Sequence, residues 1–138
     1  MAKQVKGDIN WLGTQTINSG VISEVLLAAE NVSTDVTTKQ TLFTVPTGKT
    51  CILSNRVLLV TGSTAPTGDG SGGIGSDANA TDFITPVTYP SAANKVKYPI
   101  KSTGGTAPVY QPGDVIGWKA TADTTTTTVK IYLYGFLI

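Results

Sequence analysis

Apolar and polar residues alternate along two long segments of the chain, and this alternation predicts β-strands. In residues 129–138 (VKIYLYGFLI), one face of the strand would carry three aliphatic side chains, those of Val129, Ile131 and Leu133. The opposite face would carry Lys130, Tyr132, Tyr134 and Phe136. Because the segment ends on Leu137 and Ile138 without a polar tail, we expect this strand to lie inside a sheet.

Residues 50–61 (TCILSNRVLLVT) form the second long segment, and both of its faces are mostly apolar toward the far end. A strand in a single thin sandwich is expected to face water on one side. The second apolar face must therefore meet another layer of the protein or another chain.

Shorter apolar segments, separated by proline and glycine, predict further strands at residues 41–45, 83–89, 96–100, 109–110 and 115–120. Proline and glycine at 46–49 and 111–114 predict reverse turns. The internal prolines Pro86 and Pro99 favour edge or bulged strands. Residues 21–30 (VISEVLLAAE) fit both helical and strand spacing, and the surrounding pattern favours a strand. Seven or eight short strands predict an all-β fold, an antiparallel β-sandwich of jelly-roll type at residues 21–138.

Two segments fall outside this pattern. Residues 62–82 contain six glycines and predict a long loop, either disordered or functional. This loop holds one GGxGxD sequence, but calcium binds between stacked copies of that repeat, so a mobile loop is favoured over a calcium site. Residues 1–20 have few apolar positions and predict an N-terminal arm. Trp11 and Leu12 stand out there, either tucked onto their own domain or docked on a neighbouring subunit.

Composition agrees with an all-β domain and excludes several functions. Of the 138 residues, which suit one domain, 46 are β-branched (23 Thr, 13 Val and 10 Ile). The chain has no histidine, which excludes Ser-His-Asp catalysis, Cys-His catalysis and histidine-ligated metal sites. Charged residues make up 14% and the net charge is +1, so we expect no nucleic acid as the main partner.

Targeting signals are not expected either. One cysteine cannot form an intrachain disulfide, and the sequence has neither a Sec-type signal peptide nor an apolar run of roughly 20 residues. These features predict synthesis in a cytoplasm and no association with a membrane.

The carboxylates are scattered, and none suggests an enzyme. Asp114 and Asp123 could in principle face a sugar, but a turn and a loop explain them better. Cys51 lies in an alternating strand and is expected in the core. We therefore expect no catalytic, cofactor or metal site. Tyr132 and Tyr134, together with Lys130, could form a platform for a sugar or a protein, or an ordinary surface between sheets or subunits.

Three segments carry a resemblance to a known group of proteins: residues 42–63 (LFTVPTGKTCILSNRVLLVTGS), 109–120 (VYQPGDVIGWKA) and 129–138. They resemble small jelly-roll proteins of bacteriophage virions, namely capsid decoration (cement) proteins, head fibres and tail-fibre tips. These segments cover less than a third of the chain. The resemblance implies a virion protein, commonly trimeric, without catalytic residues.

Together, these observations predict a structural virion protein, a capsid decoration protein that forms a homotrimer and stabilises the capsid lattice. It would be made in the host cytoplasm and would bind the major capsid protein or another virion protein. The candidate partner-binding residues are Trp11, Leu12, Tyr132 and Tyr134. Two alternatives remain: the tip of a head or tail fibre that binds a receptor or a host surface glycan, and a coat protein built from one jelly roll.

Overall fold

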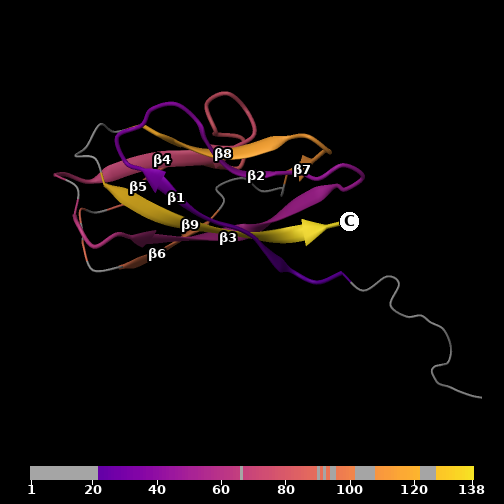
Figure 1. Ribbon diagram of the computed structural model, residues 1–138, viewed down its shortest axis with the longest axis horizontal. Coiled ribbons are helices and arrows are strands. Elements are labelled where there is room, and N and C mark those ends of the chain that lie inside the picture. The colour runs from indigo at the N-terminus through magenta and orange to yellow at the C-terminus, as the bar shows by residue number, and fades with distance from the viewer. Residues whose placement is uncertain are drawn as a thin grey trace, which may run out of the picture.

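Two antiparallel β-sheets pack face to face around one core in the computed structural model (Figure 1). The structure describes residues 22–65, 67–89, 91, 93, 96–101, 108–121 and 127–138. These residues form nine strands and no helix: β1 (Val25–Ser33), β2 (Gln40–Thr44), β3 (Cys51–Thr61), β4 (Gly70–Gly75), β5 (Ile84–Tyr89), β6 (Lys97–Lys101), β7 (Val109–Tyr110), β8 (Val115–Ala120) and β9 (Thr128–Leu137).

The strand order is that of a jelly roll. One sheet has the order β1-β9-β3-β6, with the two-residue β7 also paired to β3, and the other has the order β2-β8-β4-β5. When β7 is set aside, eight strands form two four-stranded sheets, and the first and last strands lie next to each other. This arrangement is the double-sheet jelly roll. The predicted antiparallel sandwich is therefore confirmed.

The core lies between the two sheets and is filled by the inward sides of their strands. From β9 it receives Val129, Ile131 and Leu133, all of which are buried. From β8 in the opposite sheet it receives Ile116 and Trp118, which are also buried. One continuous apolar cluster joins these residues. The predicted grouping of Val129, Ile131 and Leu133 onto one face is therefore confirmed, and the structure shows that this face is the inward one.

Most of the other strand predictions are also confirmed. Residues 21–30 contribute a strand, not a helix, although β1 begins only at Val25. The strands that contain Pro86 and Pro99 are β5 and β6, and each lies at the edge of its sheet. The C-terminal strand lies inside a sheet, between β1 and β3. The predicted arm, residues 1–20, lies outside the described residues.

The prediction of one long loop at residues 62–82 is wrong. Residues Gly70–Gly75 form β4, which lies in the interior of its sheet between β8 and β5. Its glycines make room for large rings, because a Cβ atom on Gly70 would overlap the Tyr89 ring and one on Gly72 would overlap the Trp118 ring. The aromatic residues that need this space lie 19 and 46 residues away, so the strand cannot be recognised from its own composition.

The close packing of Trp118 on Gly72 predicts the effect of adding one methyl group. We expect Gly72→Ala to lower the free energy of unfolding by about 1–3 kcal/mol, because the ring has to move in a filled core. Urea unfolding followed by tryptophan fluorescence would measure this change. Gly68→Ala is the matched control, since a Cβ atom there meets no atom within 4 Å. Equal stability of the two variants would contradict the packing argument.

Candidate interaction surface

The outer face of the five-stranded sheet carries the aromatic side chains that the sequence singled out. On β9, Lys130, Tyr132, Tyr134 and Phe136 alternate with the buried residues and are themselves half-buried. The predicted placement of Tyr132 and Tyr134 on one shared face is therefore confirmed, and the structure shows that this face points away from the core. Trp11 and Leu12, the other two candidate residues, lie outside the described residues.

Neighbouring strands extend this surface sideways. Tyr132 lies opposite Ala29 of β1 and Leu58 of β3, and Leu58 in turn lies opposite Pro99 of β6. Because side chains of paired residues share a face, these four form one apolar row across the sheet. The apolar outer side of residues 50–61 is thus half-covered by neighbouring side chains within the sheet, and no second layer of the described chain packs on it.

Two cations lie over the tyrosines of this face. The Lys130 Nζ atom is 5.6 Å from the centre of the Tyr132 ring, and the Arg56 Cζ atom is 6.0 Å from the centre of the Tyr134 ring. Cation–π attraction at such distances is worth about 0.5–1 kcal/mol at an exposed site. A groove of about 340 Å³ lies beside Tyr134, lined also by Arg56, Val57, Leu58 and Pro99. The face therefore offers flat aromatic area with adjacent positive charge.

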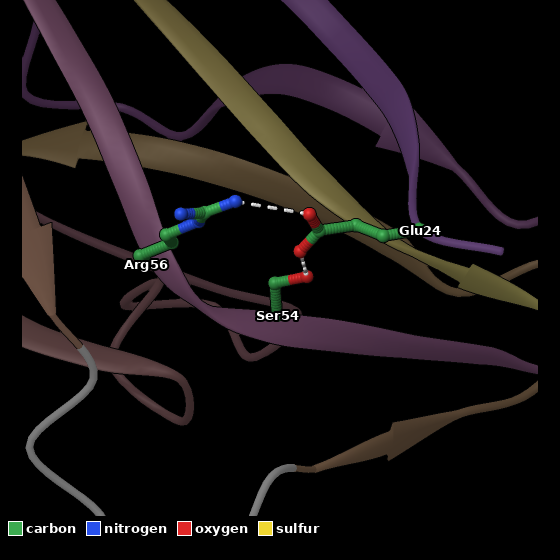
Figure 2. A network of polar contacts seen from close by, with 3 residues as sticks. All are labelled: Glu24, Ser54 and Arg56. Atoms are coloured by element: carbon green, nitrogen blue, oxygen red, sulfur yellow. Dashed lines mark hydrogen bonds and ion pairs between the residues drawn. The ribbon is translucent and has the colours of Figure 1, made fainter.

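A polar network holds the start of β1 across this face (Figure 2). Glu24, just before β1, reaches over β9 to β3. There its Oε2 atom accepts a hydrogen bond from the Ser54 hydroxyl, and its Oε1 atom lies 3.0 Å from the Arg56 Nη2 atom. The Ser54 hydrogen bond, together with the hydrogen bond and charge of Arg56, outweighs desolvation and lowers the pKa of Glu24 below its ordinary value of 4.5.

Exposed large aliphatic side chains collect at one end of the same sheet. The described chain exposes six of them by more than a third: Ile22, Val25, Leu26, Val96, Val109 and Ile138. All except Val96 lie where β1 begins, β9 ends and β7 pairs with β3 (Figure 1). At this level Ile52 lies opposite both Phe136 and Val109, and the backbones of Thr50 and Ile138 exchange two hydrogen bonds. We call Ile22, Leu26, Ile52, Val109, Phe136 and Ile138 the apolar end.

The opposite half of the face is basic. Lys130 lies opposite Val60 of β3, and Val60 lies opposite Lys97 of β6. Glu30 is the nearest carboxylate on β1. It lies opposite the inward-facing Ile131 of β9, so its register places it on the other face of the sheet from Lys130. Among the described side chains, the outer face of this half therefore carries positive charge without a carboxylate beside it. We call Leu58, Val60, Lys97, Lys130 and Tyr132 the basic half.

Sequence reasoning missed the apolar end and Glu24. The exposed Val109 belongs to a strand of only two residues, which is too short for any periodicity. The bond between Glu24 and Ser54 joins residues 30 positions apart, so no local spacing reveals it. One signal was present for the outer face as a whole: both faces of residues 50–61 are mostly apolar toward the far end, which includes Leu58 and Val60.

The two carboxylates of the loop that follows β4, those of Asp77 and Asp82, accept hydrogen bonds from nearby groups of the chain. Asp77 accepts hydrogen bonds from the backbone N–H groups of Asn79, Thr81 and Asp82. Asp82 accepts bonds from Ser76 and from the Tyr110 hydroxyl, whose pKa is raised by burial and by this carboxylate. The described residues contain no group of three or more His, Cys, Asp or Glu side chains that could hold a metal ion.

Two of the other candidates for chemistry, Cys51 and Asp114, lie where the sequence placed them. Cys51 is buried, and desolvation raises the pKa of its thiol to about 11, so the reactive thiolate is disfavoured at neutral pH. Asp114 accepts a hydrogen bond from the Gln111 N–H group within the predicted turn. Asp123 lies outside the described residues. In the part of the chain with described structure, no helix is long and apolar enough to cross a membrane.

Comparison with known proteins identifies the fold. The sequence matches no known protein family and no curated protein. The structure matches a chain of the solved "Cyanophage Pam1 capsid asymmetric unit", with a TM-score of 0.59 and 16% sequence identity. The match covers 97% of this chain and 98% of that chain. The two chains share one fold over nearly their whole lengths.

Protonation of Glu24 is expected to loosen the start of β1. A carboxylate whose pKa is lowered by folding contributes stability that is present above pH 4.5 and lost as the pH falls through the lowered value. We expect hydrogen exchange at residues 22–25 to accelerate, relative to the core strands, between pH 5 and the acid limit of folding. Glu24→Gln should remove most of this pH dependence. Glu30→Gln, which changes an exposed glutamate within β1, should leave this pH dependence in place.

Proposed function

We propose that the chain is a structural protein of a bacteriophage virion, a capsid decoration protein that acts by binding and not by catalysis. The observation that supports this most is the match, along nearly the full length of both chains, to a chain from a phage capsid asymmetric unit. The jelly roll is a recurrent fold of viral capsid domains, although the fold alone also serves lectins and cupins. Because that neighbour is part of a capsid, we favour a place on the capsid over one in a fibre or tail.

The outer face of the five-stranded sheet supports a role in assembly. Exposed apolar area of this kind marks a surface that meets another protein. Completing the burial of five half-exposed aliphatic side chains would contribute about 4–7 kcal/mol before the cost of association. A single contact of that size between two copies is weak, whereas the identical contacts of a closed homotrimer act together. We therefore propose a homotrimer, which would present its lattice-binding parts three times.

Two parts of the chain are proposed to contact the lattice. The basic half, with Lys97 and Lys130, suits an acidic surface of the major capsid protein or of another virion protein. The N-terminal segment, with Trp11 and Leu12, is proposed as an anchoring arm, because large aromatic side chains are favoured anchors at interfaces. The described residues begin at Ile22, close in sequence to Glu24, whose side chain lies across the outer face (Figure 2).

Purified protein added to particles of its own phage that lack it should bind to saturation at a fixed number of copies. We expect Lys130→Glu to weaken this binding at least tenfold and to reduce its dependence on salt, because a positive contact becomes repulsive. Lys119→Glu is the matched control, since Lys119 lies on β8 of the other sheet. Binding that does not saturate, or equal loss in both variants, would contradict the proposal.

Removal of residues 1–20 tests the anchoring arm separately. The described strands begin at Val25, so we expect the shortened chain to keep its fold and its oligomeric mass. It should fail to attach to particles in a sedimentation assay. Trp11→Ala in the full chain should weaken attachment in the same direction. Undiminished attachment of both variants would remove the arm from the mechanism.

A glycan-binding tip of a head or tail fibre is the second candidate. The groove beside Tyr134 favours it, since an aromatic face with an adjacent Arg56 suits a sugar. A specific response on a glycan array that Tyr134→Ala abolishes would support this candidate. The third candidate, a single-jelly-roll coat protein, would be supported if the chain assembled by itself into closed shells.

A further inference from the structure

We infer that a second copy of this chain covers the apolar end, so that the copies of the oligomer meet there and not at the basic half. This inference rests on one part of the proposed function, the association of several copies into an oligomer, and names the surface through which they associate. It assigns two partners to two parts of one face: its own kind at Ile22, Leu26, Ile52, Val109, Phe136 and Ile138, and a different, acidic protein at the basic half.

The first argument is the amount of uncovered aliphatic surface. Ile22, Leu26, Val109 and Ile138 are each exposed by 52–54%, whereas the core residues of the same sheet are exposed by 8% at most. Val109 lies opposite the half-buried Ile52, Ile52 lies opposite the half-buried Phe136, and Ile138 follows Phe136 two residues later on β9. Exposed apolar area of this kind is disfavoured in water and is typical of a protein interface.

The second argument is charge. Residues that lie close to the symmetry axis of a closed oligomer meet their own counterparts in the other copies, so a patch with net charge at the axis repels itself. At the apolar end the charges balance: Glu24 is paired with Arg56, and the two turns at this end carry Lys49 and Asp114. The basic half carries Lys97 and Lys130 together, which would oppose the same patch of a second copy. Self-association is therefore electrostatically permitted at one end of the face and opposed at the other.

The third argument is the open backbone at this end. Among the described strands, β1 pairs only with β9, and β7 pairs only with β3, so each leaves one edge without a partner strand. Near Val25 and Leu26 the β1 edge carries exposed aliphatic side chains, without the lysines or prolines that usually protect an edge strand. Both open edges flank the apolar end, and another copy of the chain can supply the missing hydrogen bonds there.

Multi-angle light scattering and sedimentation of the purified chain test this inference without any particle. We expect the wild-type chain to form one defined oligomer at micromolar concentration. Val109→Lys and Ile138→Lys should each raise the dissociation constant at least 100-fold and give the 14.3 kDa monomer. Val96→Lys is the matched control, because Val96 is an exposed valine, 39% accessible, away from the apolar end. This variant should keep the wild-type mass.

Unchanged far-ultraviolet circular dichroism and cooperative unfolding would show that the lysine variants remain folded. A wild-type chain that stays monomeric at 100 µM would overturn the inference. So would oligomers that persist in both Val109→Lys and Ile138→Lys, or dissociation caused by Val96→Lys. If the oligomer dissociates as expected but the wild-type chain does not bind particles, the proposed function is wrong and the inference stands. If the wild-type chain is monomeric but still binds particles, the inference is wrong and the proposed binding to the capsid stands.

Discussion

The pairing of β9 with β1 on one side and β3 on the other is the interaction on which the rest of the molecule depends. The register of these three strands decides the face of every side chain they carry. It sends Ile131 and Leu133 into the core and Tyr132 and Tyr134 to the outer surface. A slip of one residue would exchange these two sets, burying a lysine and exposing the core. Stability and interaction therefore depend on the same register.

The two sheets of the jelly roll contribute differently, one mainly to the packing of the core and the other also to an apolar and basic outer face. The sheet with β4 packs its glycines against Trp118 and Tyr89, so its contribution is to the core. The sheet with β9 has an outer face that is apolar at one end and basic at the other. Within the apolar part, the hydrogen bond from Ser54 to Glu24 holds the start of β1 in place. One face of a small chain can in this way serve contacts of two different chemistries.

Much of this could be predicted from local sequence. Pro86 and Pro99 marked edge strands because proline has no N–H group for a second neighbour. The faces of residues 129–136 followed from a period of two. Gly70–Gly75 could not be predicted, because glycine has no side chain to alternate and low strand propensity. That segment forms a strand because distant aromatic rings occupy the space above it.

The sequence by itself determined the class of the fold, the turns and the division of the side chains of β9 between two faces. These properties depend on residues within a few positions of one another. Only the tertiary structure decided which strands become neighbours, and so where Ile22, Val109 and Ile138 come together. Strands that follow one another in a jelly roll mostly lie in different sheets. A surface built across one sheet therefore gathers residues from distant parts of the chain, whose proximity no local pattern encodes.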